Sequence, residues 1–191
     1  RRYYTALCEQ RKGLTGDDTV LKLEFLMKKA GISEGDRPVI APALQKAALT
    51  GSPAAAMQLA DGSIVTGKTS DLLGASSALL LNALKKLAGI ADEVHLISPE
   101  IIEPIQHLKV GHLGNRNPRL HTDEALVALS ICAATDEKAE MAMEQLGKLR
   151  GCEVHSSVIL SAVDEKVFRR LGVNITCEPQ YQAKTENRAL A

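Results

Sequence analysis

Aromatic residues are scarce in this sequence, with two Phe, three Tyr and no Trp among 191 residues. The core therefore has to be assembled from Leu, Ile, Val and Ala. The scarcity also argues against single-stranded nucleic-acid binding, because such proteins stack successive bases on aromatic side chains. Lysine plus arginine (23) balances aspartate plus glutamate (23), so no overall basic field attracts nucleic acid. We expect no nucleic-acid partner.

Cysteines are few and scattered. Cys8, Cys132, Cys152 and Cys177 include no CxxC pair. No secretory signal opens the chain, so reduced thiols in the cytoplasm are the favoured interpretation. We expect no metal and no other cofactor. Apolar runs are also short of the roughly 18 residues that span a membrane, and we expect no membrane partner.

Residues 62–69, GSIVTGKT, fit the phosphate-loop pattern of a glycine, four residues and Gly-Lys-Thr. A phosphate loop needs a flexible segment whose backbone N–H groups surround an anion at the start of a helix. Here Ile64, Val65 and Thr66 are β-branched and resist positive φ angles. They suit a strand, and Asp61-Gly62 between two alternating runs indicates a hairpin.

The predicted hairpin pairs Leu59 with Ile64 and Met57 with Thr66 on one face of the sheet. In this arrangement the motif is a turn followed by a strand, and its backbone N–H groups are not available to surround a triphosphate. We therefore predict that no nucleotide binds at GSIVTGKT.

Residues 1–49 are predicted to be helical. A polar first segment is followed by a break at Gly13–Gly16. The stretch DDTVLKLEFLMKKAG then has acids in its first turn and lysines in its last, both favourable to the helix dipole. A third helix is expected within residues 34–49, disturbed by two prolines. Because the chain begins without methionine in a helical pattern, we expect a piece of a longer protein.

Beyond residue 53 the pattern alternates between strands and helices. This order predicts an α/β protein, a three-layer α/β/α sandwich with a mixed sheet, preceded by a helical segment. We divide the chain into a helical segment (1–52), an α/β/α domain (53–182) and a flexible tail (183–191). After the hairpin, the expected elements are a buried helix at 75–89, a strand at 93–98, a helix from Pro99, helices at 122–134 and 136–151, a strand at 154–160, a helix at 164–172 and a strand at 173–178.

Several stretches resemble the C-terminal part of a bacterial family catalogued as domain of unknown function eighteen-forty-six. They are VTGKTSDLLGASSALLLNALKKLAGI, ISPEIIEPIQHLK, LGNRNPRLHTDEALVALSI and GCEVHSSVILSAVDEKVFRRLGVNITCEP. The resemblance covers essentially the whole chain. It implies a cytosolic protein with considerably longer full-length members and no established activity. It also implies a phosphate-loop-like segment outside this piece, and some members carry labels such as ATP-dependent protease.

The order of hairpin, loop, buried helix and strand is also similar to the core of the zinc-dependent cytidine deaminases. Those enzymes need a His or Cys and a Glu at the first turn of the buried helix, and Pro-Cys-x-x-Cys after the next strand. Residues 72–84, LLGASSALLLNAL, contain no His, Cys, Asp or Glu, and SPEIIEP after the expected strand has no cysteine. A shared shape would therefore not bring shared chemistry.

The stretch from Pro104 to Thr122 is rich in cationic side chains and contains no acidic residue. Its arginines and asparagines offer forked donors suited to phosphate or carboxylate. The alternative is a structural loop whose arginines bind neighbouring carboxylates or contact another subunit. The predicted anion-binding residues are Asn115, Arg116, Asn117, Arg119 and His121.

Lys68, Ser70 and His155 are secondary candidates. Lys68 and Ser70 lie where the hairpin meets the next helix, and the simpler interpretation is that a hydroxyl there caps a turn. Cys152 and His155 point to opposite faces of a strand, so a half-buried His155 bonded to backbone is favoured over a catalytic one. A zinc site made of Cys152, His155 and His121 has no support from spacing.

Two function hypotheses remain open. The first is an accessory or oligomerisation domain that helps to assemble a larger cytosolic protein, with the rest of the parent chain or a second copy as partner. The second is an enzyme domain acting on a phosphorylated or carboxylated small molecule held by the arginine loop. The lack of a complete catalytic constellation favours the first, whereas an anion at Arg116 or Arg119 would favour the second.

Overall fold

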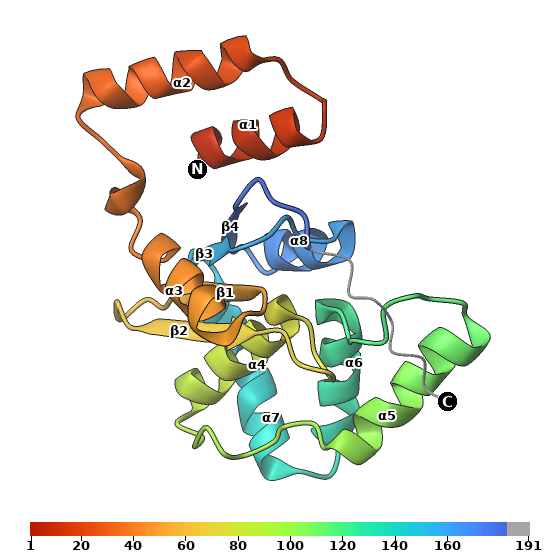
Figure 1. Cartoon of the computed structure of the whole chain (residues 1–191). Coiled ribbons are helices and arrows are strands. Elements are labelled where there is room, and N and C mark those ends of the chain that lie inside the picture. Colours follow the sequence, from red (N-terminus) through yellow and green to blue (C-terminus); the bar gives the residue numbers. More distant parts are fainter. Residues whose placement is uncertain (183–191) are drawn as a thin grey trace.

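The computed structural model describes residues 1–182 as a helical arm standing on an α/β body (Figure 1). The arm consists of α1 (Arg2–Arg11) and α2 (Asp17–Ala30), and η1 (Glu34–Asp36) joins it to the body. Gly31 ends α2 at a φ of 67°, a left-handed conformation that favours glycine. The predicted helical N-terminal segment is confirmed.

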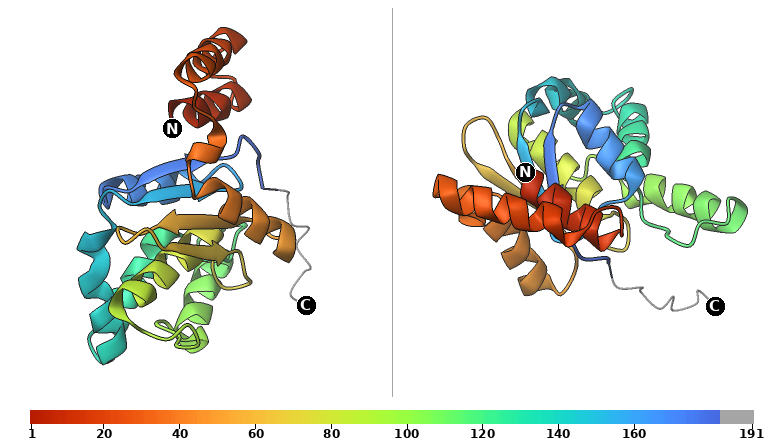
Figure 2. Two further views of the ribbon diagram at one scale, coloured as in Figure 1. Left: turned by 90° about the vertical axis from the view of Figure 1, so that its left-hand side faces the viewer. Right: turned by 90° about the horizontal axis from the view of Figure 1, so that it is seen from above.

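The four strands of the described chain form a mixed sheet in the order β2-β1-β3-β4. β1 is antiparallel to both β2 and β3, whereas β3 and β4 are parallel. Because α1 packs on β4, the arm extends the body beyond that edge of the sheet (Figure 2). The strands are β1 (Ala54–Gln58), β2 (Ile64–Lys68), β3 (Glu153–Ser156) and β4 (Asn174–Cys177).

Helices cover both faces of this sheet. On one face α3 (Ile40–Thr50) packs on the strands, and its Ala43 joins Ala56 of β1 in a small buried cluster. On the other face α4 (Ala75–Ala88) packs on β1 and β2, and Met57 belongs to the main core. The predicted three-layer α/β arrangement is confirmed. The remaining elements are α5 (Pro99–His107), the π-helix η2 (Leu108–His112), α6 (Thr122–Cys132), α7 (Glu137–Met143), the 3-10 helix η3 (Glu144–Leu149) and α8 (Ala162–Arg170).

GSIVTGKT forms a turn and strand β2, as predicted, but the register of the hairpin differs by one residue. Met57 pairs with Val65 rather than with Thr66, and Leu59 is shifted in the same way. The prediction assumed a two-residue turn. In the structure Gly62, with a φ of 83°, is the last residue of a turn and donates its N–H to the carbonyl of Leu59. The N–H of Leu59 donates to the carbonyl of Ser63, so the loop contains one more residue than predicted.

Gly67, the second glycine of the motif, is required by helix packing. A Cβ atom at this position would lie 2.1 Å from the backbone nitrogen of Leu79 in α4. The two glycines that complete the phosphate-loop pattern therefore serve a turn and a close contact between strand and helix. In addition, α4 begins only at Ala75, so no helix opens at the end of the motif.

The strand predicted at 93–98 is wrong, because residues 91–98 form turns and irregular structure. Leu96 and Ile97 are adjacent and each is only 5% exposed. Successive side chains of a strand point to opposite faces, whereas here both are drawn into one core next to α4. Without this strand, the deaminase-like order predicted for the sheet is not supported.

Two further predicted elements differ in the structure. β3 ends at Ser156, shorter than the expected strand at 154–160. The helix expected at 136–151 is α7 followed by η3. The expected tail at 183–191 lies outside the described residues. The division of the chain at residue 52 stays a prediction.

Candidate functional site

Three helices, α4, α6 and α8, have their N-termini tied together by one short segment. The carbonyl of Leu120 accepts a hydrogen bond from the backbone N–H of Gly74 at 3.3 Å, just before α4. The backbone N–H and hydroxyl of Thr122, at the start of α6, both donate to Asp164 of α8, at 2.9 and 3.0 Å. Because helix N-termini carry positive partial charge, this end of the body favours negative charge.

His121 lies inside this junction. Its Nδ1 atom is 3.3 Å from Asp164 Oδ2 and 3.4 Å from the hydroxyl of Ser161, which itself donates to Asp164 at 2.8 Å. The hydrogen bond to Asp164 raises the pKa of His121, although burial acts in the opposite direction. The serine and the aspartate meet the same ring nitrogen, whereas a catalytic triad uses both nitrogens. The cluster is therefore a tie between α6 and α8.

Burial pushes the pKa of Asp164 upward, but hydrogen bonds from His121, Thr122 and Ser161 outweigh burial and hold the pKa below its ordinary value. Asp164 thus remains a carboxylate and neutralises the junction. Neither Ser161 nor Asp164 was predicted. The only local signal is the Ser-x-x-Asp spacing of the two residues, which resembles a helix-capping pattern.

Lys109, which precedes the predicted anion-binding loop at residues 115–121, holds that loop from the protein interior. Its Nζ atom donates to the carbonyl of Arg119 at 2.7 Å and to Glu124 Oε2 at 2.6 Å, and the residue is 3% exposed. The same Glu124 oxygen accepts from the backbone N–H of His121 at 2.8 Å, and His121 is the N-cap residue of α6. Glu124 and Asp164, which lie outside the stretch from Pro104 to Thr122, therefore neutralise Lys109 and His121.

The remaining loop residues face other partners. Arg119 donates from Nε to the carbonyl of Ser70 at 2.6 Å, and Asn117 Oδ1 accepts from the backbone N–H of Arg119 at 3.2 Å. Within residues 1–182, neither arginine of the loop forms an ion pair. Asn115 and Arg116 are exposed. The structure thus brings Ser70, Asn117 and Arg119 together, while anion binding stays a prediction.

Ser70 caps a turn, as the simpler interpretation holds. Its Oγ atom accepts from the backbone N–H groups of Leu72 and Leu73 at 3.3 and 3.1 Å. Lys68 is exposed at the end of β2, where it pairs with Ala54 across the sheet. Of these two secondary candidates, Ser70 joins the arginine loop.

His155 is fully buried and bonded to side chains, which corrects the prediction of a half-buried histidine bonded to backbone. Its Nδ1 is 2.8 Å from Thr176 Oγ1, and its Nε2 is 2.9 Å from Glu178 Oε1. Burial, assisted by the charge of Arg37, lowers the pKa of His155 to about 4, and burial raises the pKa of Glu178. The ring of Tyr4 in α1 packs edge-on at 4.7 Å. His155 is therefore neutral and structural.

The zinc ligands considered from the sequence lie in separate surroundings. Cys152 Sγ is 3.7 Å from the carbonyl of Lys148, whereas His155 and His121 belong to the two clusters described above. In the part of the chain that the structure describes, no three His, Cys, Asp or Glu residues are grouped as metal ligands.

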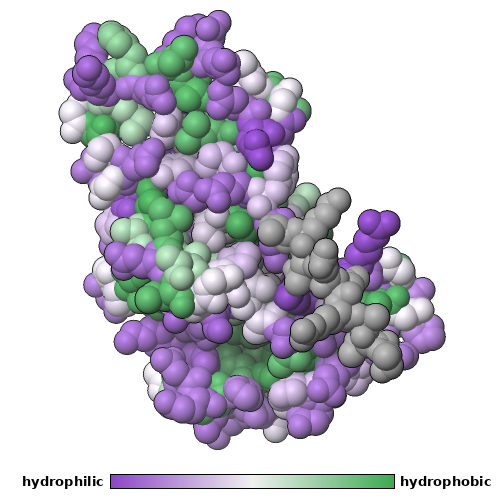
Figure 3. Space-filling model, viewed as in Figure 1, coloured by the Kyte–Doolittle hydropathy of each residue, from purple (hydrophilic) through white to green (hydrophobic). Residues whose placement is uncertain are grey.

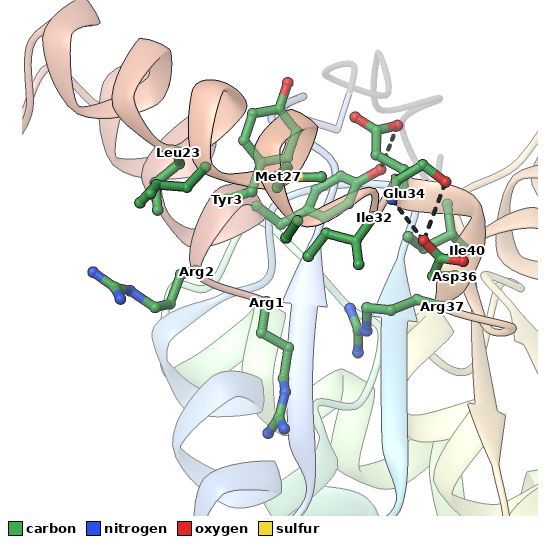
Figure 4. Close-up of a pocket in the computed structure, with 14 residues that line it drawn as sticks. Arg1, Arg2, Tyr3, Leu23, Met27, Ile32, Glu34, Asp36, Arg37 and Ile40 are labelled. Atoms are coloured by element: carbon green, nitrogen blue, oxygen red, sulfur yellow. Dashed lines mark hydrogen bonds between the residues drawn. The ribbon is translucent and has the colours of Figure 1, made fainter.

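A cavity of about 800 Å³ lies between α1, α2 and η1. Figure 4 shows the side chains of Leu23, Met27 and Ile32 gathered in it, with the guanidinium groups of Arg1 and Arg37 below them in this view. The cavity is much larger than a packing defect and is open at the arm. Sequence pattern gave no sign of it, because its walls come from three separate elements.

The sequence profile described as "Domain of unknown function DUF1846, C-terminal" matches residues 35–186, and the chain belongs to this family. The UPF0371 proteins of Corynebacterium urealyticum and Streptococcus pyogenes serotype M5 are 55% and 52% identical over 184 and 182 residues. These matches cover 96% and 95% of this chain. The chain spans only 37% of the length of either relative.

The family resemblance seen in the sequence is thereby confirmed. Among residues 1–182, no helix has both the length and the apolar character needed to cross a bilayer.

Proposed function

We propose that this chain is an accessory domain of a larger protein, and that its arm docks on the remainder of that protein. The observation that carries the proposal is the outer face of α2, where Leu21 and Phe25 are 59% and 66% exposed. They lie one helical turn apart. On the opposite side, Val20 is buried and Met27 lines the cavity next to α1. A helix that is apolar on two sides is expected to be covered on both.

The apolar surface continues around the arm. Leu14, Leu26 and Ile32 are 71%, 53% and 53% exposed. The upper part of Figure 3 shows hydrophobic residues of the arm between hydrophilic ones. Covering one such side chain contributes about 1.5–3 kcal/mol, so several together suffice for a stable contact. Grouped exposed apolar residues of this kind mark interaction surfaces more often than single ones do.

The remainder of the parent chain is the occupant that we favour. The relatives are much longer than this chain, which spans 37% of them. A covalently linked partner has a high effective concentration, so even a modest apolar surface would be covered by it. A cytoplasmic location is part of the proposal, because all four cysteines are free thiols.

The proposal is tested by amide hydrogen exchange of α2 in this chain and in a family-length protein. We expect slower exchange of α2 in the longer protein, and Phe25→Ser should restore fast exchange there. Leu49→Ser in α3, where Leu49 is 84% exposed, is the matched control and should change nothing. Equal exchange in both proteins would contradict the proposal. Protection that depends on the concentration of the 191-residue chain would instead assign this face to a second copy.

A second function is favoured by a different observation. Arg119 is anchored through Nε on Ser70 and has no acidic partner within residues 1–182. We propose on this ground an enzyme domain that acts on a phosphorylated or carboxylated small molecule, with the loop holding its anionic group.

A further inference from the structure

An apolar pocket lies directly beside the anchored arginine. It has a volume of about 220 Å³ and lies between α4 and residues 94–102. Figure 3 shows a hydrophobic recess with a hydrophilic rim in this lower part of the molecule. Ser70 lines the pocket and also binds Arg119 through its carbonyl, so it belongs to both features. The apolar wall includes Leu72, Leu81, Ile97 and Ile102.

Three side chains have unused donors: Ser70, which lines the pocket, Arg119, which binds the carbonyl of Ser70, and Asn117, which binds the backbone of Arg119. The hydroxyl of Ser70 accepts two backbone N–H groups, which leaves its own proton for another acceptor. Arg119 uses Nε, and its two terminal amino groups have no acceptor within residues 1–182. Asn117 accepts through Oδ1, which leaves its NH₂ group. Donors without acceptors match an anion with several oxygens.

The position of these donors is fixed before any ligand binds. The buried ammonium of Lys109 binds the carbonyl of Arg119, and Glu124 holds that ammonium. Two acids of this region already have partners, because Glu124 binds Lys109 and Asp164 binds Thr122. Asp71 is exposed, follows Ser70 in the sequence and forms no ion pair within residues 1–182, so its carboxylate would compete with an anionic ligand. A site fixed in this way loses little conformational entropy on binding.

We propose that Ser70, Asn117 and Arg119 bind the phosphate group of a small molecule whose apolar part occupies the neighbouring pocket. Arginine alone suffices for a carboxylate, whereas donors from three side chains suit the larger number of oxygens on a phosphate. The site deepens the second function proposed above and rests on it, but it is independent of the docking of the arm.

The test is calorimetric titration of the 191-residue chain with phenyl phosphate, inorganic phosphate and phenylacetate. Phenyl phosphate carries both the phosphate and an apolar group, so it should bind about tenfold more tightly than inorganic phosphate. Phenylacetate should bind more weakly than phenyl phosphate. Equal affinity for all three, or no binding at millimolar concentration, would overturn the proposal.

Variants separate the two halves of the site. Arg119→Gln should lower the affinity for phenyl phosphate and for inorganic phosphate at least tenfold. Asp71→Asn should raise both affinities, because it removes the competing carboxylate. Ala78→Met, which fills the pocket, should remove only the advantage of phenyl phosphate. Arg170→Gln, at the exposed end of α8, is the charge-matched control and should leave every affinity unchanged. If Arg119→Gln fails to fold, Asp71→Asn and Ala78→Met decide the question.

If Arg119→Gln and Arg170→Gln lower the affinity for phosphate equally, the effect comes from the net charge of the protein and the site is contradicted. The two proposals can fail separately. If phenyl phosphate binds tightly but amide exchange of α2 is equally fast in the 191-residue chain and in the longer protein, the phosphate site is supported and the docking proposal fails. The reverse combination would support docking and refute the phosphate site.

Discussion

The Nζ atom of the buried Lys109 lies 2.6 Å from Oε2 of the partly buried Glu124, and this pair fixes the base of the loop at residues 115–121. Lys109 belongs to the π-helix Leu108–His112, whose wider turn continues from α5. The side chain reaches inward and also binds the carbonyl of Arg119. One buried ammonium thus connects the end of α5, the loop and the start of α6.

Replacing Lys109 with Met should destabilise the protein by about 2–4 kcal/mol, because it leaves the carboxylate of Glu124 without its partner. The expected result is a lower midpoint of urea unfolding. Lys148→Met is the control, since Lys148 is exposed and forms no ion pair within residues 1–182. Similar midpoints for both variants would mean that the pair of Lys109 and Glu124 contributes no stability.

Gly67→Ala should cost at least about 2 kcal/mol, because the added methyl group would meet the backbone of Leu79 and force α4 away from β2. Gly147→Ala is the control, since a Cβ atom there has no neighbour within 4 Å and its φ is not left-handed. Thermal unfolding of the two variants measures the difference. Unchanged stability of Gly67→Ala would show that the strand and helix can separate without cost.

His155 should make the protein less stable in acid. Its pKa is lowered from 6.5 to about 4 in the folded state, so the unfolded chain binds a proton first as the pH falls. Its contribution is present above pH 6.5 and is lost as the pH falls toward 4, by roughly 3 kcal/mol. His155→Asn should flatten this part of the stability curve in chemical unfolding. Glu178→Gln is the control, because it removes the contacting acid and should keep the loss of stability that His155 causes as the pH falls. Parallel curves would contradict the buried neutral histidine.

The junction of α6 and α8 should show the opposite pH dependence. The pKa of His121 is raised, so its contribution is present below the unfolded value of 6.5 and is lost as the pH rises through the folded value. Asp164→Asn should remove this pH dependence and lower stability at every pH, because Asp164 accepts hydrogen bonds from His121, Thr122 and Ser161. Asp123→Asn, at an exposed position of the same helix start, should keep the dependence. Stability curves from pH 5 to 8 decide between these outcomes.

The candidate phosphate site was only half visible in the sequence. The loop at 115–121 was found because its cations lack acids nearby in sequence. Glu124 and Asp164, which neutralise Lys109 and His121, come from outside that stretch. The pocket beside Ser70 is formed by α4 and residues 94–102, so local pattern gives no sign of it.

The sequence by itself determined the elements whose cause is local. Three β-branched residues at 64–66 and Gly62 specify a turn and a strand, and Gly31 and Gly89 end helices in left-handed conformations. These features depend on neighbours in the chain, which the sequence shows directly.

Only the tertiary structure decided features that depend on distant partners. Leu96 and Ile97 are both buried in the core, so the strand predicted there does not form. One additional residue in the turn shifts the register of the hairpin. His155 is buried and neutral, with Thr176 and Glu178 as its hydrogen-bond partners from a distant part of the chain. In each case packing between residues far apart in the chain outweighed local pattern, because burial and hydrogen bonding act through space and not along the sequence.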